Sequence, residues 1–228
     1  ELLSRAGLIA CPYVNWIRPA VRSAMQVVKG PEDVVCGIYP PVTNQIVALR
    51  IAEATGAKLV LDFRDEYLGL ATGVRRRLAN RWQQRFLARA DLVSVATDTV
   101  GEDFVASGLD PARLHLTENG YWEAPETIPA YTAQEKIRIV YIGAISATQG
   151  VDILARAAQR LMRDRPSVGE RLEIVIYGPD TPHRRATLSG SLPACVTYGG
   201  YLPAQEVGVK LLSTDVAFLS LSSDRYAY

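Results

Sequence analysis

Residues 137–180 read IRIVYIGAISATQGVDILARAAQRLMRDRPSVGERLEIVIYGPD, and this stretch decides the fold. Ile137–Ile142 has bulky β-prone residues at nearly every position, which predicts a strand buried on both faces, as in the centre of a parallel sheet. From Gly150 the apolar residues recur close to the helical period of about 3.6 residues, and a second apolar strand follows and ends at Gly178. The apolar helical positions are Val151, Ile153, Leu154, Ala157, Ala158 and Leu161. The stretch therefore predicts a strand, a crossover helix and a second parallel strand.

The turns of this unit form the first candidate site. Backbone N–H groups and helix N-termini point toward the carboxyl ends of parallel strands, so glycine-rich turns there can hold phosphate. We expect Gly143, Ala144, Gln149, Gly150 and Gly178 to line such a phosphate site. The alternative, that glycine after a strand serves only the turn, stays open.

Composition places the chain in an ordinary globular class. Its 228 residues are 48% hydrophobic and 21% charged, with a net charge of +1, which gives no reason to expect nucleic acid as a partner. The 3 cysteines lack CxxC spacing, which argues against a disulfide framework or a zinc site. No apolar run approaches the roughly 18–20 residues of a membrane span, and no signal peptide is visible. These features predict a cytoplasmic protein.

Strands and helices alternate from end to end. The strands expected outside the first unit are Val34–Ile38, Lys58–Asp62, Leu92–Ala96, Leu114–Thr117, Val196–Tyr198 and Val216–Leu221. The helices expected between them are Val42–Thr55, Val74–Ala88, Thr99–Ser107 and Ala204–Leu212. Such alternation is typical of α/β domains with parallel sheets.

The periodic pattern breaks once, after Asn119 and Gly120. The segment that follows carries prolines and many polar residues without a clear period, which is typical of an interdomain linker. We therefore expect a partial N-terminal domain at 1–122, a linker at 123–135 and a partial C-terminal domain at 136–228.

Six segments, in order, make the chain resemble the GT-B-fold glycosyltransferases. It is similar above all to the retaining, nucleotide-sugar-dependent group that contains bacterial polysaccharide and phosphatidylinositol mannosyl transferases. The segments are DVVCGIYPP at 33–41, KLVLDFRDEYLG at 58–69, ARADLVSVATDTVGEDFVASGLDPARLHLTENGY at 88–121, IRIVYIGAISATQGVDIL at 137–154, LEIVIYGPD at 172–180 and VTYGGYLPAQEVGVKLLSTDVAFLSL at 196–221.

The resemblance implies two Rossmann-like, doubly wound α/β domains that face one another across a cleft. The N-terminal domain would be the acceptor side, and the C-terminal domain would bind the nucleotide sugar. The protein would move the sugar to a glycan or lipid-linked acceptor with retention of configuration. In this group the donor diphosphate is commonly held by protein groups, so we expect neither a metal site nor a cofactor.

The chain also departs from the family pattern. The family's first strand and glycine-rich loop are not represented before Glu1, and its downstream acidic pair would lie beyond Tyr228. An Arg/Lys pair usually follows the first strand of the C-terminal domain, where this chain has Ala144 and Gln149. We therefore expect a fragment that lacks both ends and is inactive alone.

The resemblance and the residue types together nominate an acceptor-side cluster. Arg64 and Asp65 are the catalytic candidates, because they follow a buried strand close to where other members carry a histidine. Asp62, Asn119 and Gly120 are candidates for the acceptor side or cleft. The alternatives are a capping or ion-paired role for the charged residues and a left-handed turn at Asn119.

Three further residues are candidates for donor binding. Arg184 follows the Gly178 loop and could reach phosphate. Tyr201 and Leu202 follow a strand and two glycines, and they could lie against the nucleotide base. An aromatic residue at such a position is equally compatible with a place in the core or at an interface.

Helix 73–90 carries six arginines and no acidic residue. Leu78, Trp82, Phe86 and Leu87 are spaced to form an apolar stripe along it. A basic amphipathic helix can rest on anionic lipid, which would place the protein on the inner face of a membrane. The alternative is a solvated basic face on a helix that packs normally against the sheet.

Two other functions remain open. The absent Arg/Lys pair would suit a non-catalytic GT-B-like domain that binds a partner or glycan. A nucleotide-sugar epimerase of similar fold would convert the donor without an acceptor. A nicotinamide dehydrogenase is disfavoured, because no G-x-G-x-x-G follows any strand.

Overall fold

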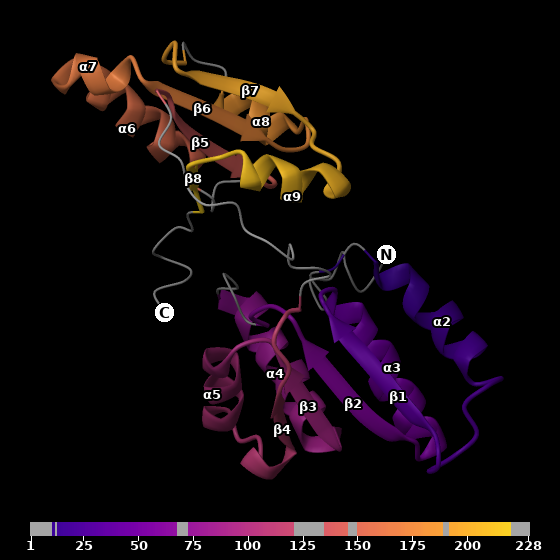
Figure 1. Cartoon of the computed structure of the whole chain (residues 1–228). Helices are drawn as coiled ribbons and strands as arrows, with labels where there is room; N and C mark the ends of the chain where they lie inside the picture. The colour runs from indigo at the N-terminus through magenta and orange to yellow at the C-terminus, as the bar shows by residue number, and fades with distance from the viewer. Residues whose placement is uncertain are drawn as a thin grey trace. The chain divides into compact units, whose positions relative to one another are not determined.

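The computed structural model describes residues 11, 13–67, 73–120, 135–145, 150–188 and 192–219. The chain divides into two compact units, Glu1–Tyr121 and Trp122–Tyr228. Each unit holds a four-stranded parallel sheet with helices packed on it (Figure 1). The expected α/β class with parallel sheets is confirmed.

The strands of the first unit lie side by side in chain order, β1-β2-β3-β4. They are β1 (Val34–Tyr39), β2 (Lys58–Phe63), β3 (Leu92–Val95) and β4 (Leu114–Leu116). The crossovers contain α3 (Val42–Thr55), α4 (Gly73–Arg89), and α5 (Asp98–Ala106) with the short η2 (Pro111–Arg113). A short η1 (Val14–Trp16) and α2 (Ile17–Ala24) precede β1, and α2 packs on α3.

All three crossover helices cover one face of this sheet. Leu61 and Phe63 are fully buried on that face, where Phe63 meets Phe104 of α5 with ring centroids 4.5 Å apart. The residues that point to the other face of β1 are exposed, with Val34 at 63% and Ile38 at 50%. The helix side therefore holds the core of the unit.

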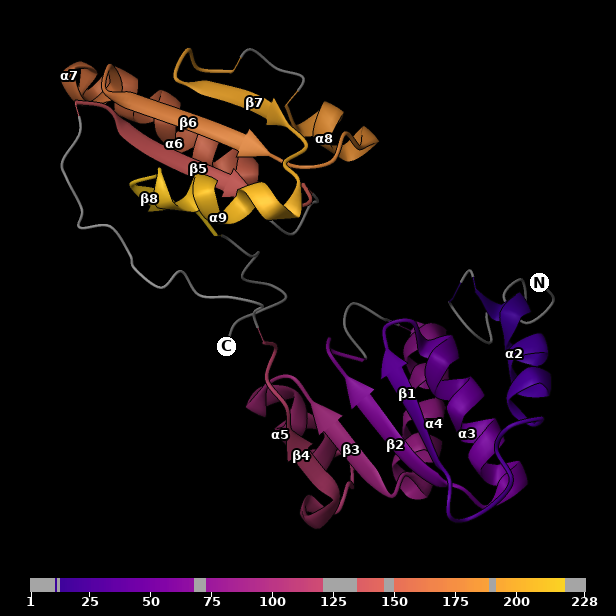
Figure 2. The same ribbon diagram turned by 45° about the vertical axis from the view of Figure 1, so that its right-hand side comes forward.

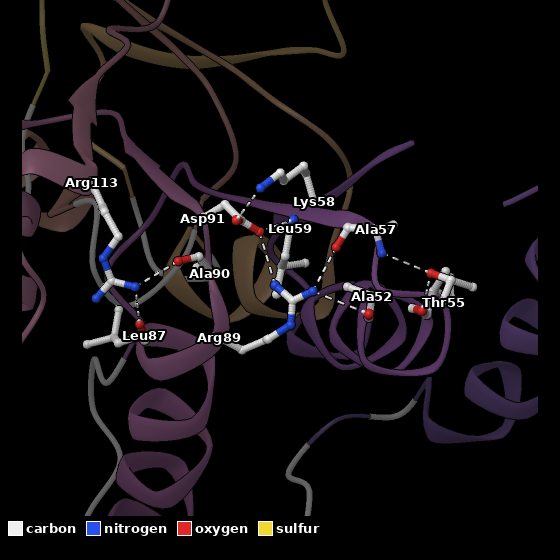
Figure 3. Close-up of polar contacts among 11 residues, drawn as sticks. Ala52, Thr55, Ala57, Lys58, Leu59, Leu87, Arg89, Ala90, Asp91 and Arg113 are labelled. Carbon is white, nitrogen blue, oxygen red and sulfur yellow. Dashed lines mark hydrogen bonds and ion pairs between the residues drawn. The ribbon is translucent and has the colours of Figure 1, made fainter. Parts of the chain in front are cut away.

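A polar network closes the amino-terminal edge of the same sheet (Figure 3). Arg89, at the end of α4, donates to the carbonyl oxygens of Ala52 and Ala57 at 3.3 and 2.7 Å and to Asp91 at 3.0 Å. Asp91 in turn accepts the Leu59 N–H at 2.8 Å. These bonds join the ends of α3 and α4 to the starts of β2 and β3, and the Ala52 carbonyl also accepts the Gly56 N–H at 2.9 Å.

Arg113 extends the network to β4. Its Nη1 donates to the carbonyl oxygens of Leu87 and Ala90 at 3.1 and 2.8 Å. A cation at a helix C-terminus is also favoured by the helix dipole. The segment that enters β4 is thereby fixed to the end of α4.

We predict that Asp91→Asn lowers the free energy of unfolding by about 1 kcal/mol or less near neutral pH, because solvent screens this partly exposed carboxylate. The Leu59 N–H, followed by Arg89 and Lys58, holds the pKa of Asp91 below its ordinary value. The resulting stabilisation is present above the unfolded-state pKa of about 3.9 and is lost as pH falls through the folded-state pKa. Urea unfolding across the acid range should therefore show the two proteins converging at low pH.

Glu102→Gln is the matched control, because Glu102 is exposed and makes no ion pair among the residues that the structure describes. Its unfolding free energy should stay at the wild-type value. If the free energy of unfolding of Asp91→Asn stays below the wild-type value by the same amount at every pH, the role of the Asp91 charge is contradicted.

The second unit has the strand order β7-β6-β5-β8. Its strands are β5 (Ile137–Ile142), β6 (Leu172–Tyr177), β7 (Val196–Gly200) and β8 (Val216–Ala217). Its helices are α6 (Val151–Asp164), α7 (Pro166–Gly169), α8 (Pro182–Thr187) and α9 (Ala204–Leu212). Helices α6 and α8 lie on one face of the sheet and α9 lies on the other (Figures 1 and 2).

Strongly periodic segments matched their expected bounds. Strand Ile137–Ile142 and helices Val42–Thr55 and Ala204–Leu212 are confirmed at both ends, and most other elements differ by one or two residues. Helices α2, α7 and α8 were not expected. They are short and carry proline, which weakens a helical pattern. Of the expected strand Val216–Leu221, only Val216–Ala217 pairs, and its last two residues lie outside the described part.

Burial along β5 and α6 differs in part from expectation. Val140 and Tyr141, which point to opposite faces of β5, are both buried, whereas Arg138 near its start is exposed. On α6 the core side is formed by Val151, Leu154 and Ala158. Ile153 and Ala157 lie on the exposed side, because the stripe that meets the sheet is narrower than the apolar pattern.

Candidate functional site

The order of strands in the second unit reverses at β5. The chain runs from β5 outward through β6 to β7 and then returns to the other side of β5 with β8. In open α/β sheets, ligands bind outside the carboxyl ends of the strands at such a switch point, because the crossovers diverge there. The first unit shows no reversal among its described strands. The carboxyl end of β5 is therefore the topological candidate for a ligand site.

Two of the expected glycines meet at this end. The Gly143 N–H donates to Tyr177 O at 3.0 Å, and the Gly178 N–H donates to Gly200 O at 2.9 Å. A Cβ on Gly178 would stand 2.2 Å from the carbonyl oxygen of Gly143. Both N–H groups are thus already used by the backbone, and the glycines allow close approach of two strand ends instead of offering free donors.

Ala144 and Gly150 are the next of the expected site residues along the chain. Ala144 is exposed, and its carbonyl oxygen accepts the Tyr141 hydroxyl at 2.7 Å, which holds the turn. Gly150 is the N-cap of α6 with φ of 57°, a left-handed conformation that favours glycine. The N-terminal N–H groups of a helix have no partner within it, and they carry the positive end of its dipole. Gln149 lies outside the described residues.

Arg184 of α8 follows the Gly178 turn in the sequence, and two side chains hold its guanidinium. Its guanidinium carbon lies 4.4 Å from the centroid of the Tyr198 ring, and Nη2 pairs with Asp180. The Tyr198 hydroxyl donates to Gly178 O at 2.7 Å, so the arginine is linked to the glycine turn. Its side chain is only 17% exposed, and Nε is buried without a hydrogen-bond partner in the described structure.

Tyr201 and Leu202 follow β7 at the same edge. Tyr201 is 71% exposed, which leaves its ring accessible, while Leu202 is half-buried. An exposed aromatic ring at a strand end is available for stacking.

The first unit carries a second polar cluster at the carboxyl ends of its strands. Arg64 Nη2 donates to Thr117 O, and Arg64 Nε lies 3.3 Å from Asp62 Oδ2 without hydrogen-bond geometry. The Thr117 hydroxyl accepts from Ser94 at 3.0 Å. Arg64 therefore links the end of β2 to the segment after β4.

Gln45 of α3 contacts this cluster through the backbone of Asp62. It is fully buried, and its Nε2 donates to Asp62 O at 3.2 Å, while its Oε1 has no partner among the described residues. Asp62 Oδ1 is likewise buried without a partner. Unpaired buried acceptors are rare and cost about 1–3 kcal/mol each.

Asp65, Asn119 and Gly120 stand apart from these contacts. All three are exposed, and the side chains of Asp65 and Asn119 make no hydrogen bond or ion pair within the described ranges. Asp62 and Arg64 are brought together, whereas Asp65 is not joined to them.

Sequence reasoning missed Asp180, Tyr198 and Gln45. A signal existed for Asp180, since it lies four residues before Arg184 and directly precedes Thr181, which caps α8. No local sequence signal marks Tyr198 or Gln45, because their hydrogen-bond partners are distant in the sequence.

The arginines of α4 divide into two groups. Arg85 makes a bidentate pair with Glu53 at 2.7 and 2.9 Å, and Arg89 belongs to the network at the amino edge. Arg77 and Arg81 are exposed and have no ion pair within the part of the chain that is described. The expected apolar stripe faces inward, with Phe86 and Leu87 buried in the core.

No group of three or more His, Cys, Asp or Glu residues in the described part could hold a metal ion. None of the described helices is long and apolar enough to cross a bilayer.

Comparison with known protein families decides the identity of the first unit. A family described as "Glycosyl transferase 4-like domain" matches residues 5–120, which is just over half of the chain. The chain belongs to this glycosyltransferase family. No curated protein sequence matches it.

Solved structures resemble this glycosyltransferase chain over both units. Anabaena HepE in complex with UDP and glucose is 13% identical, with a TM-score of 0.62, and the match covers 95% of this chain and 57% of that one. A mutant of S. aureus TarM in complex with fondaparinux, alpha-GlcNAc-glycerol and UDP is 13% identical, with a TM-score of 0.64. The match covers 89% of this chain and 40% of that one.

A Listeria monocytogenes protein described as a candidate UDP-N-acetylglucosamine 2-epimerase is 15% identical, with a TM-score of 0.55. The match covers 92% of this chain and 58% of that one. The glycosyltransferase chain thus spans between two fifths and three fifths of these structures. At such identities the likeness establishes the fold. Both units match Rossmann-like domains of the GT-B class, and the expected fold class is confirmed.

We predict that Gly178→Ala destabilises the second unit by about 1–3 kcal/mol, because overpacking forces the Gly143 carbonyl away. Gly208→Ala in α9 is the matched control, since a Cβ there meets nothing within 4 Å. That control should gain about 0.5–1 kcal/mol from the better helix propensity of alanine. Urea unfolding measures both changes, and equal effects of the two substitutions would contradict the close approach.

Proposed function

We propose that the protein transfers a sugar from a nucleotide-sugar donor to a glycan or lipid-linked acceptor, with retention of configuration. The observation that carries the proposal is the reversal of strand order at β5, which puts a switch point beside Gly143 and Gly178. Membership in the glycosyl transferase 4-like family supports it. The similar HepE structures contain UDP or UDP-glucose, which favours a donor of that class.

In this proposal the donor diphosphate lies near Ala144 and Gly150. Departure of the sugar leaves negative charge on the phosphate, so N–H groups aimed there stabilise the transition state more than the ground state. The first N–H groups of α6, after its N-cap Gly150, would supply such donors, and Gln149 precedes them in the sequence. Arg184 adds a cation that Tyr198 and Asp180 already orient. Tyr201 and Leu202 would border the base.

The first unit would hold the acceptor near Asp62, Arg64, Asp65, Asn119 and Gly120. Arg64 is fixed to the Thr117 carbonyl, so its remaining N–H groups would donate to acceptor hydroxyls from a defined position. Retention needs no carboxylate nucleophile if the leaving phosphate accepts the acceptor proton. Asp65 would then orient the acceptor hydroxyl rather than attack the sugar.

The test is calorimetric titration of the protein with UDP, GDP and ADP. We expect saturable binding of one nucleotide and its loss in Ala144→Trp, because Ala144 is exposed at the strand end and a large ring there blocks the turn without disturbing the core. Gln159→Trp, on the exposed side of α6, adds the same ring elsewhere and should bind as the wild type does. Absence of nucleotide binding by a folded protein, or equal binding by both variants, would refute this donor site.

A nucleotide-sugar epimerase is the second candidate, favoured by the similarity to the Listeria protein. Such an enzyme would convert the donor sugar with no acceptor present. Chromatography of UDP-sugars after incubation without acceptor separates the two functions, since a transferase leaves the sugar configuration unchanged. A non-catalytic glycan-binding domain would bind no nucleotide at all.

We also propose that α4 touches an anionic membrane surface through Arg77 and Arg81. Because Phe86 and Leu87 are buried, the contact would rely on charge, with Val74, 69% exposed, as an apolar group on the same helix. Each cation near an anionic surface contributes about 1 kcal/mol, screened by salt. This contact would suit a lipid-linked acceptor.

Arg77→Gln with Arg81→Gln should lower partition onto phosphatidylglycerol-containing vesicles by roughly 30-fold, the equivalent of about 2 kcal/mol. Arg156→Gln with Arg160→Gln on α6 removes the same charge elsewhere and should have little effect. Vesicle sedimentation measures both variants. Equal losses would attribute binding to net charge and contradict a specific role of α4.

A further inference from the structure

A cavity of about 210 Å³ lies between α4 and α5 of the first unit. Its wall includes Arg76 and Gln83 of α4, Asp103 of α5, and Glu66 and Tyr67 from the segment after β2. Arg76 and Gln83 are seven residues apart and therefore share one face of the helix. The cavity is lined by helix-layer residues and does not include the strand-end residues assigned above to donor and acceptor.

Gln83 is the buried polar residue of this wall. It is only 3% exposed, yet its amide makes no hydrogen bond to any residue in the described ranges. Buried side-chain amides nearly always have a partner, from protein or from water. Because Gln83 lines the cavity, the partner of its amide is whatever occupies the cavity.

Charged groups on the same wall are also unpaired. The side chains of Arg76, Glu66 and Asp103 make neither an ion pair nor a hydrogen bond within the described part of the chain. The cavity thus presents donors and acceptors together. Tyr67 adds an aromatic ring, and burial, followed by nearby Tyr39, raises the pKa of its hydroxyl above the ordinary value.

This combination selects among ligand classes. Two carboxylates repel phosphate and disfavour a nucleotide, while the guanidinium of Arg76 disfavours a metal ion. A purely apolar ligand would leave the Gln83 amide without a partner. Sugar hydroxyls both donate and accept, so they can satisfy carboxylates, an amide and a guanidinium at once.

We propose that the cavity binds one sugar ring, as a carbohydrate subsite separate from the strand-end site. Hydroxyls of the ring donate to Glu66 and Asp103, and the Gln83 amide and Arg76 donate to its oxygens. Its volume lies below the roughly 300–1,000 Å³ of pockets for drug-sized ligands, which fits one ring. The inference rests on the proposed function only in that the sugar would belong to the acceptor glycan.

The test is saturation-transfer NMR with the methyl glycosides of glucose, galactose, mannose and N-acetylglucosamine. At least one glycoside should bind the wild-type protein. Binding should weaken about tenfold or more in Arg76→Gln, which loses a charged hydrogen bond, and in Gln83→Leu, which has a similar volume. Arg50→Gln carries the same charge change on an exposed position of α3 outside the cavity wall and should bind normally.

Failure of every glycoside to bind, or equal binding by Arg76→Gln, Gln83→Leu and the wild type, overturns the subsite. Arg76 is exposed, so its variant should fold even if Gln83→Leu does not. Nucleotide titration of the same variants keeps the two proposals apart. If nucleotide binds and glycosides do not, the subsite alone fails; if glycosides bind at the cavity and no nucleotide binds, the transferase alone fails.

Discussion

The parallel direction of every strand pair is the constraint on which this structure depends. Parallel strands need a crossover after each strand, so all amino ends collect at one edge of a sheet and all carboxyl ends at the other. In the first unit the amino edge is closed by Arg89, Asp91 and Arg113, whose bonds occupy the ends of α3 and α4. Near the carboxyl edge, Gln45 Oε1 and Asp62 Oδ1 are buried without a hydrogen-bond partner among the described residues.

The two sheets obey the same constraint with different strand orders. The first adds its strands in sequence, so all crossover helices cover one face. The second reverses at β5, and its helices cover both faces. Only a reversal makes neighbouring crossovers diverge and exposes backbone at the strand ends. The same local pattern of strand and helix therefore gives a switch point in the second unit and none among the described strands of the first.

Helix α4 shows how tertiary contacts divide one residue type among several roles. Arg85 and Arg89 bind Glu53 and Asp91, so their charges are part of the fold. Arg81 is exposed without an ion pair in the described structure and is the type of group that long-range attraction to an anionic surface requires. Arg76 lines the same cavity as Gln83, whose amide has no hydrogen-bond partner among the described residues. Net charge alone would have treated these arginines as equivalent.

The sequence by itself determined the fold class and most element bounds, because strand and helix periods are local: Ile137–Ile142 and Val42–Thr55 needed no knowledge of their partners. It also placed Gly143 and Gly178 at strand ends. Only the tertiary structure decided that their N–H groups are already bonded and that Arg184 lies on Tyr198, since those partners come from other strands and helices. Strand order was equally beyond the sequence pattern. Pairing depends on contacts between residues far apart in the chain, and no local period records them.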